Sequence, residues 1–106
     1  MNQLDKLNHL KNIIKQVPHE RFDLDLWRTI PGTDNMTFAQ LINSDANCCV
    51  IGWATADETF KRLNFMMLDG VPLYAPFRAN TGEPFTYEEL KTNVVYRGSE
   101  AVREFF

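Results

Sequence analysis

The sequence is poor in cysteine, and the two cysteines that it has, Cys48 and Cys49, are adjacent. A disulfide between neighbouring residues strains the peptide that joins them, so we expect both thiols to be free. A secreted scaffold held together by several spaced disulfides is therefore excluded. The chain also lacks the charged and apolar pattern of a secretion signal. These absences favour a soluble protein of the reducing cytoplasm.

The sequence also lacks a basic excess and long hydrophobic runs. It has 11 lysines and arginines against 14 aspartates and glutamates, which gives a net charge of -3. Neutralisation of phosphates supplies most of the affinity of proteins for nucleic acids, so dispersed basic residues argue against direct binding of DNA or RNA. No apolar run approaches the roughly 18 residues that cross a bilayer, so no membrane partner is expected.

Motifs for a metal, a cofactor or a phosphate are missing as well. The available metal ligands Cys48, Cys49, His9 and His19 show neither CxxC nor HxxxH spacing. Zinc sites normally take their ligands from such spacings. The glycines form neither a P-loop nor a dinucleotide-binding fingerprint. We therefore expect no metal and no cofactor.

Two arrangements of residues would still allow hydrolysis. Cys49 could lie at a helix N-terminus, where a thiolate is favoured, with His19 as its base. Asp23 and Asp25 would share one face of an extended segment and could act as a carboxylate pair. Neither spacing forces the partners together, and a cysteine in the core and a solvated acidic face are the simpler interpretations. A small hydrolase that depends on Cys and His, or on Asp, is kept as an alternative.

What the sequence does contain is enough apolar material for one hydrophobic core. Hydrophobic residues make up 44% of the chain and aromatic residues 12%. These fractions are typical of folded proteins, and a chain of 106 residues is too short for two cores. Residues 1–106 are therefore expected to form a single compact domain.

The apolar pattern predicts a mainly helical α+β fold with one β-hairpin. Leucines and isoleucines at helical spacing predict a first helix that ends at Pro18. Asp69-Gly70 between two apolar runs predicts the hairpin, and Pro72 would place its second strand at a sheet edge. The segment 19–34 is expected to be irregular, with one turn of helix at most. Further helices are predicted over 35–43, over 46–63 with a break near Asp57, over 87–93 and over 100–106.

Gly52 is the exception within the predicted helix over 46–63. A glycine inside a helix costs about 1 kcal/mol relative to alanine, so it needs a packing reason. The expected reason is the close approach of another backbone. The neighbouring Cys49, Val50 and Trp53 are predicted to form the centre of the core.

Aromatic residues in loops are the best candidates for a binding surface. Several fall in the segment 19–34 or in and beside the loop 75–84, and aromatic residues on loops often mark protein interfaces. The alternative is that these rings clamp the loops onto the core. The predicted partner-binding residues are Phe22, Asp23, Asp25, Trp27, Tyr74, Phe77, Arg78, Phe85 and Tyr87.

Three motifs carry a family resemblance. They are Glu20-Arg21-Phe22-Asp23 followed by Trp27, then Cys49-Val50-Ile51-Gly52-Trp53-Ala54, and finally Gly98-Ser99-Glu100-Ala101-Val102-Arg103-Glu104-Phe105-Phe106. With them the chain resembles a family of small uncharacterised proteins of phages and bacteria. A further cysteine of that family is Ser44 here, so a role for paired cysteines is not expected. The resemblance implies a phage or mobile-element context.

The first functional hypothesis is a non-enzymatic binding protein of phage type. Small phage proteins without a catalytic site commonly act stoichiometrically, so the analogy suggests a host protein, such as a defence component, as the inhibited partner. One alternative is a homo-oligomer that sequesters a small ligand under the loop between Tyr74 and Tyr87. The other is the small hydrolase.

Overall fold

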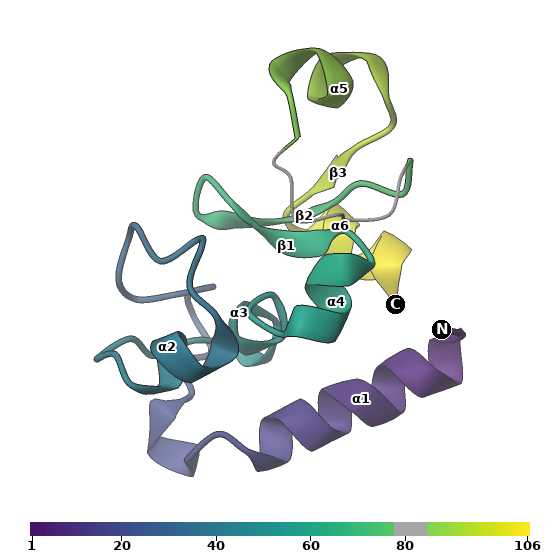
Figure 1. Ribbon diagram of the computed structural model, residues 1–106. Helices are drawn as coiled ribbons and strands as arrows, with labels where there is room; N and C mark the ends of the chain where they lie inside the picture. The colour runs from purple at the N-terminus through teal and green to yellow at the C-terminus, as the bar shows by residue number, and fades with distance from the viewer. Residues whose placement is uncertain (78–84) are drawn as a thin grey trace.

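The computed structural model describes residues 1–77 and 85–106, and within them it shows an α+β fold (Figure 1). The helices are α1 (Gln3–Lys15), the 3₁₀ helix η1 (His19–Arg21), α2 (Phe38–Ile42), α3 (Val50–Ala54), α4 (Glu58–Arg62), α5 (Tyr87–Thr92) and α6 (Ser99–Phe105). The strands β1 (Phe65–Leu68), β2 (Val71–Tyr74) and β3 (Tyr96–Arg97) form one antiparallel sheet in the order β1-β2-β3. The predicted fold class is thereby confirmed, with a third short strand added to the hairpin.

Helix α1 buries only part of its predicted apolar stripe. It lies along the outside of the molecule and ends before Pro18 (Figure 1). Ile13 and, just beyond the helix, Val17 are buried. The exposed members of the stripe are Leu4, Leu7 and Ile14. The helix therefore packs along a narrower face than its sequence pattern indicates.

The segment predicted as helix over 46–63 contains two short helices, α3 and α4, separated near Asp57 as the sequence suggests. Its first residues, 46–49, are not helical, because Cys48 pairs as extended backbone with Phe22 and Arg28. The Sγ atom of Cys49 accepts a hydrogen bond from the Gly52 amide (3.4 Å) and caps α3. The Oδ2 atom of Asp57 accepts a hydrogen bond from the Phe60 amide (3.1 Å) and caps α4. Each helix therefore begins at its own cap, and the two can point in different directions.

The hairpin turns at Asp69-Gly70, where both residues have positive φ angles (53° and 79°), as a type I′ turn requires. The predicted edge position of β2 is wrong, because β3 pairs with its other side. Pro72 is tolerated there because the β2–β3 pairing begins only at Leu73. The carbonyl of Pro72 still accepts a hydrogen bond from the Gly98 amide (2.8 Å).

An aromatic cluster joins the sheet to α4 and α6. Phe65 of β1 and Phe105 of α6 stack with their ring centroids 4.4 Å apart. Phe60 of α4 meets the edge or face of both rings and of Phe106 at nearly right angles. Such pairs add to the free energy of burying the rings. Much of the aromatic content is therefore used in the core.

The centre of the core is only partly as predicted. Trp53 is fully buried, whereas Cys49 and Val50 are partly exposed. Cys48 takes the buried position instead. The physical reason is that Cys48 lies in extended backbone and forms β-bridges to both Phe22 and Arg28, so it is covered on both sides.

Candidate functional site

The 22–30 loop, comprising residues 22–30, is fixed at both ends to the extended segment beside it. The Asp23 amide donates a hydrogen bond to the Cys48 carbonyl (2.9 Å), and the Thr29 amide donates one to the Asn47 carbonyl (2.9 Å). The core thus sets the conformation of the loop, although the loop contains no regular helix or strand.

The middle of the loop lies directly on α3, and Gly52 makes this possible. A Cβ atom built on Gly52 would stand 1.7 Å from the Trp27 carbonyl oxygen and 2.8 Å from Cβ of Cys48. The Leu26 carbonyl also accepts a hydrogen bond from the Cys49 amide (3.0 Å). The close approach predicted for Gly52 is confirmed, and the approaching backbone is that of Trp27.

Two arginines, one next to the loop and one within it, turn their guanidinium groups inward. Arg28 donates to the carbonyl oxygens of Gly52 and Thr33 and to Oγ1 of Thr55. The carbonyl oxygens that accept hydrogen bonds from Arg21 are those of Leu41, Ile42, Ser44 and Ala46. Both positive charges therefore hold the fold together beneath the loop.

The tip of the loop presents apolar side chains to solvent. Leu24 is 83% exposed and Leu26 is 51% exposed. The Oδ1 atom of Asp23 accepts a hydrogen bond from the Asp25 amide (2.9 Å), which forms an Asx turn that orders the tip. The tip therefore combines two leucines with two carboxylates in a defined conformation.

The structure divides the predicted site residues between two regions on different sides of the molecule (Figure 1). The 22–30 loop lies to the left, around α2, and α5 lies at the top. The loop contains Phe22, Asp23, Asp25 and Trp27. The sheet and α5 region contains Tyr74, Phe77, Phe85 and Tyr87. Arg78 lies outside the described residues.

Several aromatic rings of the second region are occupied by contacts with one another or with the core. Tyr74 packs against Phe105 (ring centroids 5.2 Å apart), and Phe77 packs against Phe85 (5.2 Å). Tyr87 is exposed, with Nζ of Lys91 5.7 Å from the centre of its ring. The clamping interpretation fits Tyr74, so the 22–30 loop is the better candidate site.

Sequence reasoning missed the exposed aliphatic residues of the loop. Leu24, Leu26 and Ile30 are all exposed, whereas the predicted Phe22 packs against the core. The alternation of apolar residues with Asp23 and Asp25 indicates an extended segment. It does not reveal which of the alternating side chains face solvent.

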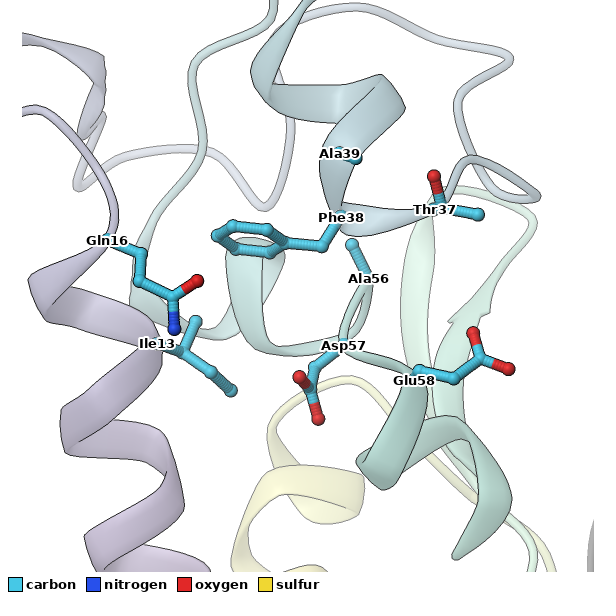
Figure 2. A pocket seen from close by; sticks show the side chains of 8 residues that line it. All are labelled: Ile13, Gln16, Thr37, Phe38, Ala39, Ala56, Asp57 and Glu58. Carbon is cyan, nitrogen blue, oxygen red and sulfur yellow. The ribbon is translucent and has the colours of Figure 1, made fainter.

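A cavity of about 340 Å³ opens elsewhere, between the end of α1 and the starts of α2 and α4 (Figure 2). Phe38 and Ile13 form much of its apolar wall, and the carboxylate of Asp57 lies at its side. That carboxylate already caps α4, and its Oδ2 atom is 2.7 Å from Nε2 of His9. The polar group best placed in the cavity is thus engaged within the fold, and we assign the cavity no ligand.

The structure places Cys49 at the N-terminus of α3, as the first hydrolase arrangement supposes, but gives the two arrangements no other support. In the described part of the chain, no hydrogen bond joins Cys49 to His19, which is exposed on η1. Asp23 uses its carboxylate to order the backbone at Asp25. Among residues 1–77 and 85–106, no group of three or more His, Cys, Asp and Glu residues is placed to hold a metal.

The two thiols are expected to differ strongly in reactivity. Burial raises the pKa of the Cys48 thiol from 9.0 to about 11, against a smaller opposing effect of Arg28. Near pH 8, iodoacetamide should therefore modify the partly exposed Cys49 at least about tenfold faster than Cys48 in the folded protein. Mass spectrometry over time measures both rates, with a Cys49→Ser variant to assign them. Equal rates before unfolding would contradict this.

The same shift has a consequence for stability at high pH. The unfolded chain releases the Cys48 proton near pH 9, whereas the folded chain keeps it until about pH 11. The free energy of unfolding should therefore decrease as the pH rises from about 9 to about 11. A Cys48→Ala variant should lack this part of the pH dependence.

No family model, curated protein or solved structure matches the chain. The resemblance to small phage and bacterial proteins therefore stays a prediction. Within the described residues, every helix is too short or too polar to cross a membrane.

Proposed function

We propose that the chain is a non-enzymatic binding protein that holds one partner protein through the 22–30 loop. In the phage context implied by its motifs, the partner is a host protein, such as a defence component, and binding inhibits it stoichiometrically in the host cytoplasm. The observation that carries the proposal is the exposure of Leu24 and Leu26 at the tip of a loop that is hydrogen-bonded to the core.

Energetics support a binding role for this tip. Single exposed leucines are common on protein surfaces, but a group of them on an ordered loop is typical of interaction sites. Burying one leucine contributes about 1.5–3 kcal/mol. A loop already held in place loses little conformational freedom when it binds, so most of that free energy is kept.

The test compares three forms of the full chain immobilised and exposed to bacterial lysate. We expect the wild type to retain one protein in stoichiometric amount and a Leu24→Ser/Leu26→Ser variant to retain roughly tenfold less or lower. The control is Leu4→Ser, which removes an equally apolar exposed leucine on α1. Circular dichroism checks that all three forms are folded.

The outcomes separate the possible sites. Retention that survives the double substitution in the loop would remove the 22–30 loop from the proposal. Retention that disappears only in Leu4→Ser would assign binding to α1. If the wild type retains no protein, the proposed function is wrong.

A further inference from the structure

The exposed charge of the 22–30 loop is negative, although two arginines lie within or next to it. The guanidinium groups of Arg21 and Arg28 donate hydrogen bonds to carbonyl and hydroxyl oxygens inside the fold. Partial burial of the guanidinium also lowers the pKa of Arg28. Asp23 is partly exposed and Asp25 is exposed beside the leucines. The loop thus offers a partner apolar groups and carboxylates.

Resting on the proposed function, we infer that the partner's site is an apolar pocket rimmed by lysine or arginine, with Leu24 inserted and Asp25 facing the rim. Leu24 is more exposed than Leu26, 83% against 51%, so it has more surface to bury and is the anchor. Carboxylates next to the anchor need basic groups opposite them, because a partner of like charge would repel the loop.

The charge also decides against two other occupants. A second copy of this chain would bring the same carboxylates together, and its own cavity has Asp57 and Glu58 in its lining. A bacterial membrane surface is anionic and would repel Asp23 and Asp25, since membrane-binding loops usually carry lysine or arginine. A basic protein pocket is the occupant that satisfies both the leucines and the acids.

The experiment starts with a photo-crosslinking amino acid, p-benzoylphenylalanine, placed at position 24 of the full chain. Irradiation in bacterial lysate and sequencing of the cross-linked peptides identifies the partner and the contacted segment. We expect that segment to combine apolar residues with lysine or arginine. The identified partner is then purified and its affinity measured by calorimetry.

Two variants with the same change in charge test the rim. Asp25→Lys should weaken the affinity by roughly tenfold or more, whereas Glu104→Lys on α6 should change it less than about twofold. Raising the ionic strength from about 0.01 M to about 1 M should weaken wild-type binding more than binding by Asp25→Lys, because the Debye length falls from about 30 Å to about 3 Å.

The outcomes distinguish failure of this inference from failure of the proposed function. If a protein cross-links at position 24 but Asp25→Lys binds as tightly as the wild type, the basic rim is wrong and the proposed function stands. If position 24 cross-links to no protein although the wild type retains one, Leu24 is not the inserted anchor and the inference is wrong. If the wild type also retains none, the proposed function is wrong as well. If the wild type binds vesicles of phosphatidylethanolamine and phosphatidylglycerol and Leu24→Ser does not, the loop binds a membrane and the inferred protein pocket is wrong. Cross-linking to a second copy of the chain would also overturn the inference.

Discussion

Replacement of Gly52 by alanine is expected to lower the free energy of unfolding by about 3 kcal/mol or more, a large part of the stability of a domain of this size. The added Cβ would stand 1.7 Å from the Trp27 carbonyl oxygen. This oxygen belongs to the backbone, so a change of side-chain rotamer cannot relieve the clash. The loop or α3 must therefore move, and the hydrogen bonds that fix the loop are lost with it. Urea unfolding followed by tryptophan fluorescence measures the change.

Gly70→Ala is the matched control for this prediction. Unlike Gly52, Gly70 has a positive φ, 79°, and no atom lies within 4 Å of the added Cβ. Only backbone strain is introduced there, so the expected cost is about 1–2 kcal/mol. If Gly52→Ala cost no more than Gly70→Ala, the contact between Trp27 and α3 would be looser than the structure shows.

Arg21→Gln is expected to cost about 3 kcal/mol. The guanidinium donates hydrogen bonds to the carbonyl oxygens of Ile42 (2.8 Å), Ser44 (2.9 Å) and Ala46 (2.6 Å). The first is the last residue of α2, and the other two follow that helix. Glutamine has a shorter side chain with two donors, so several of these partly buried carbonyls lose their partner. Thermal and urea unfolding measure the loss.

Two further substitutions sharpen the interpretation of Arg21. Arg21→Lys should be intermediate, since an ammonium group keeps the charge but not the fork of donors. Arg103→Gln removes an exposed arginine of α6 and should stay within about 0.5 kcal/mol of the wild type. An Arg21→Gln variant as stable as Arg103→Gln would show that the hydrogen bonds contribute little.

Local signals in the sequence were sufficient to predict features that depend mainly on residues close together in the chain. Pro18 ends the first helix, Asp69-Gly70 forms the hairpin turn, and the helix predicted over 87–93 forms as α5, capped by Thr86. Gly52 belongs to the same group, because a glycine inside an apolar helical pattern already indicates close packing of a second backbone.

Features that depend on contacts distant in sequence could not be predicted in this way. Pairing of Cys48 with both Phe22 and Arg28 joins residues that are more than 19 positions apart, and it decides which cysteine is buried. The same pairing turns Leu24 outward and Phe22 inward. Likewise, the sheet position of Pro72 depends on β3, whose two residues carry almost no strand signal of their own.

In the 22–30 loop, the residues that stabilise the fold are different from the residues that would determine binding specificity. The ends of the 22–30 loop are fixed by backbone hydrogen bonds at Asp23 and Thr29. These hydrogen bonds are compatible with many different side chains at the tip between them. Substitutions at Leu24 and Leu26 would therefore change what is bound at little cost to the scaffold. The same framework could be redirected to a new target by exchanging a few tip residues, as in the hypervariable loops of antibodies.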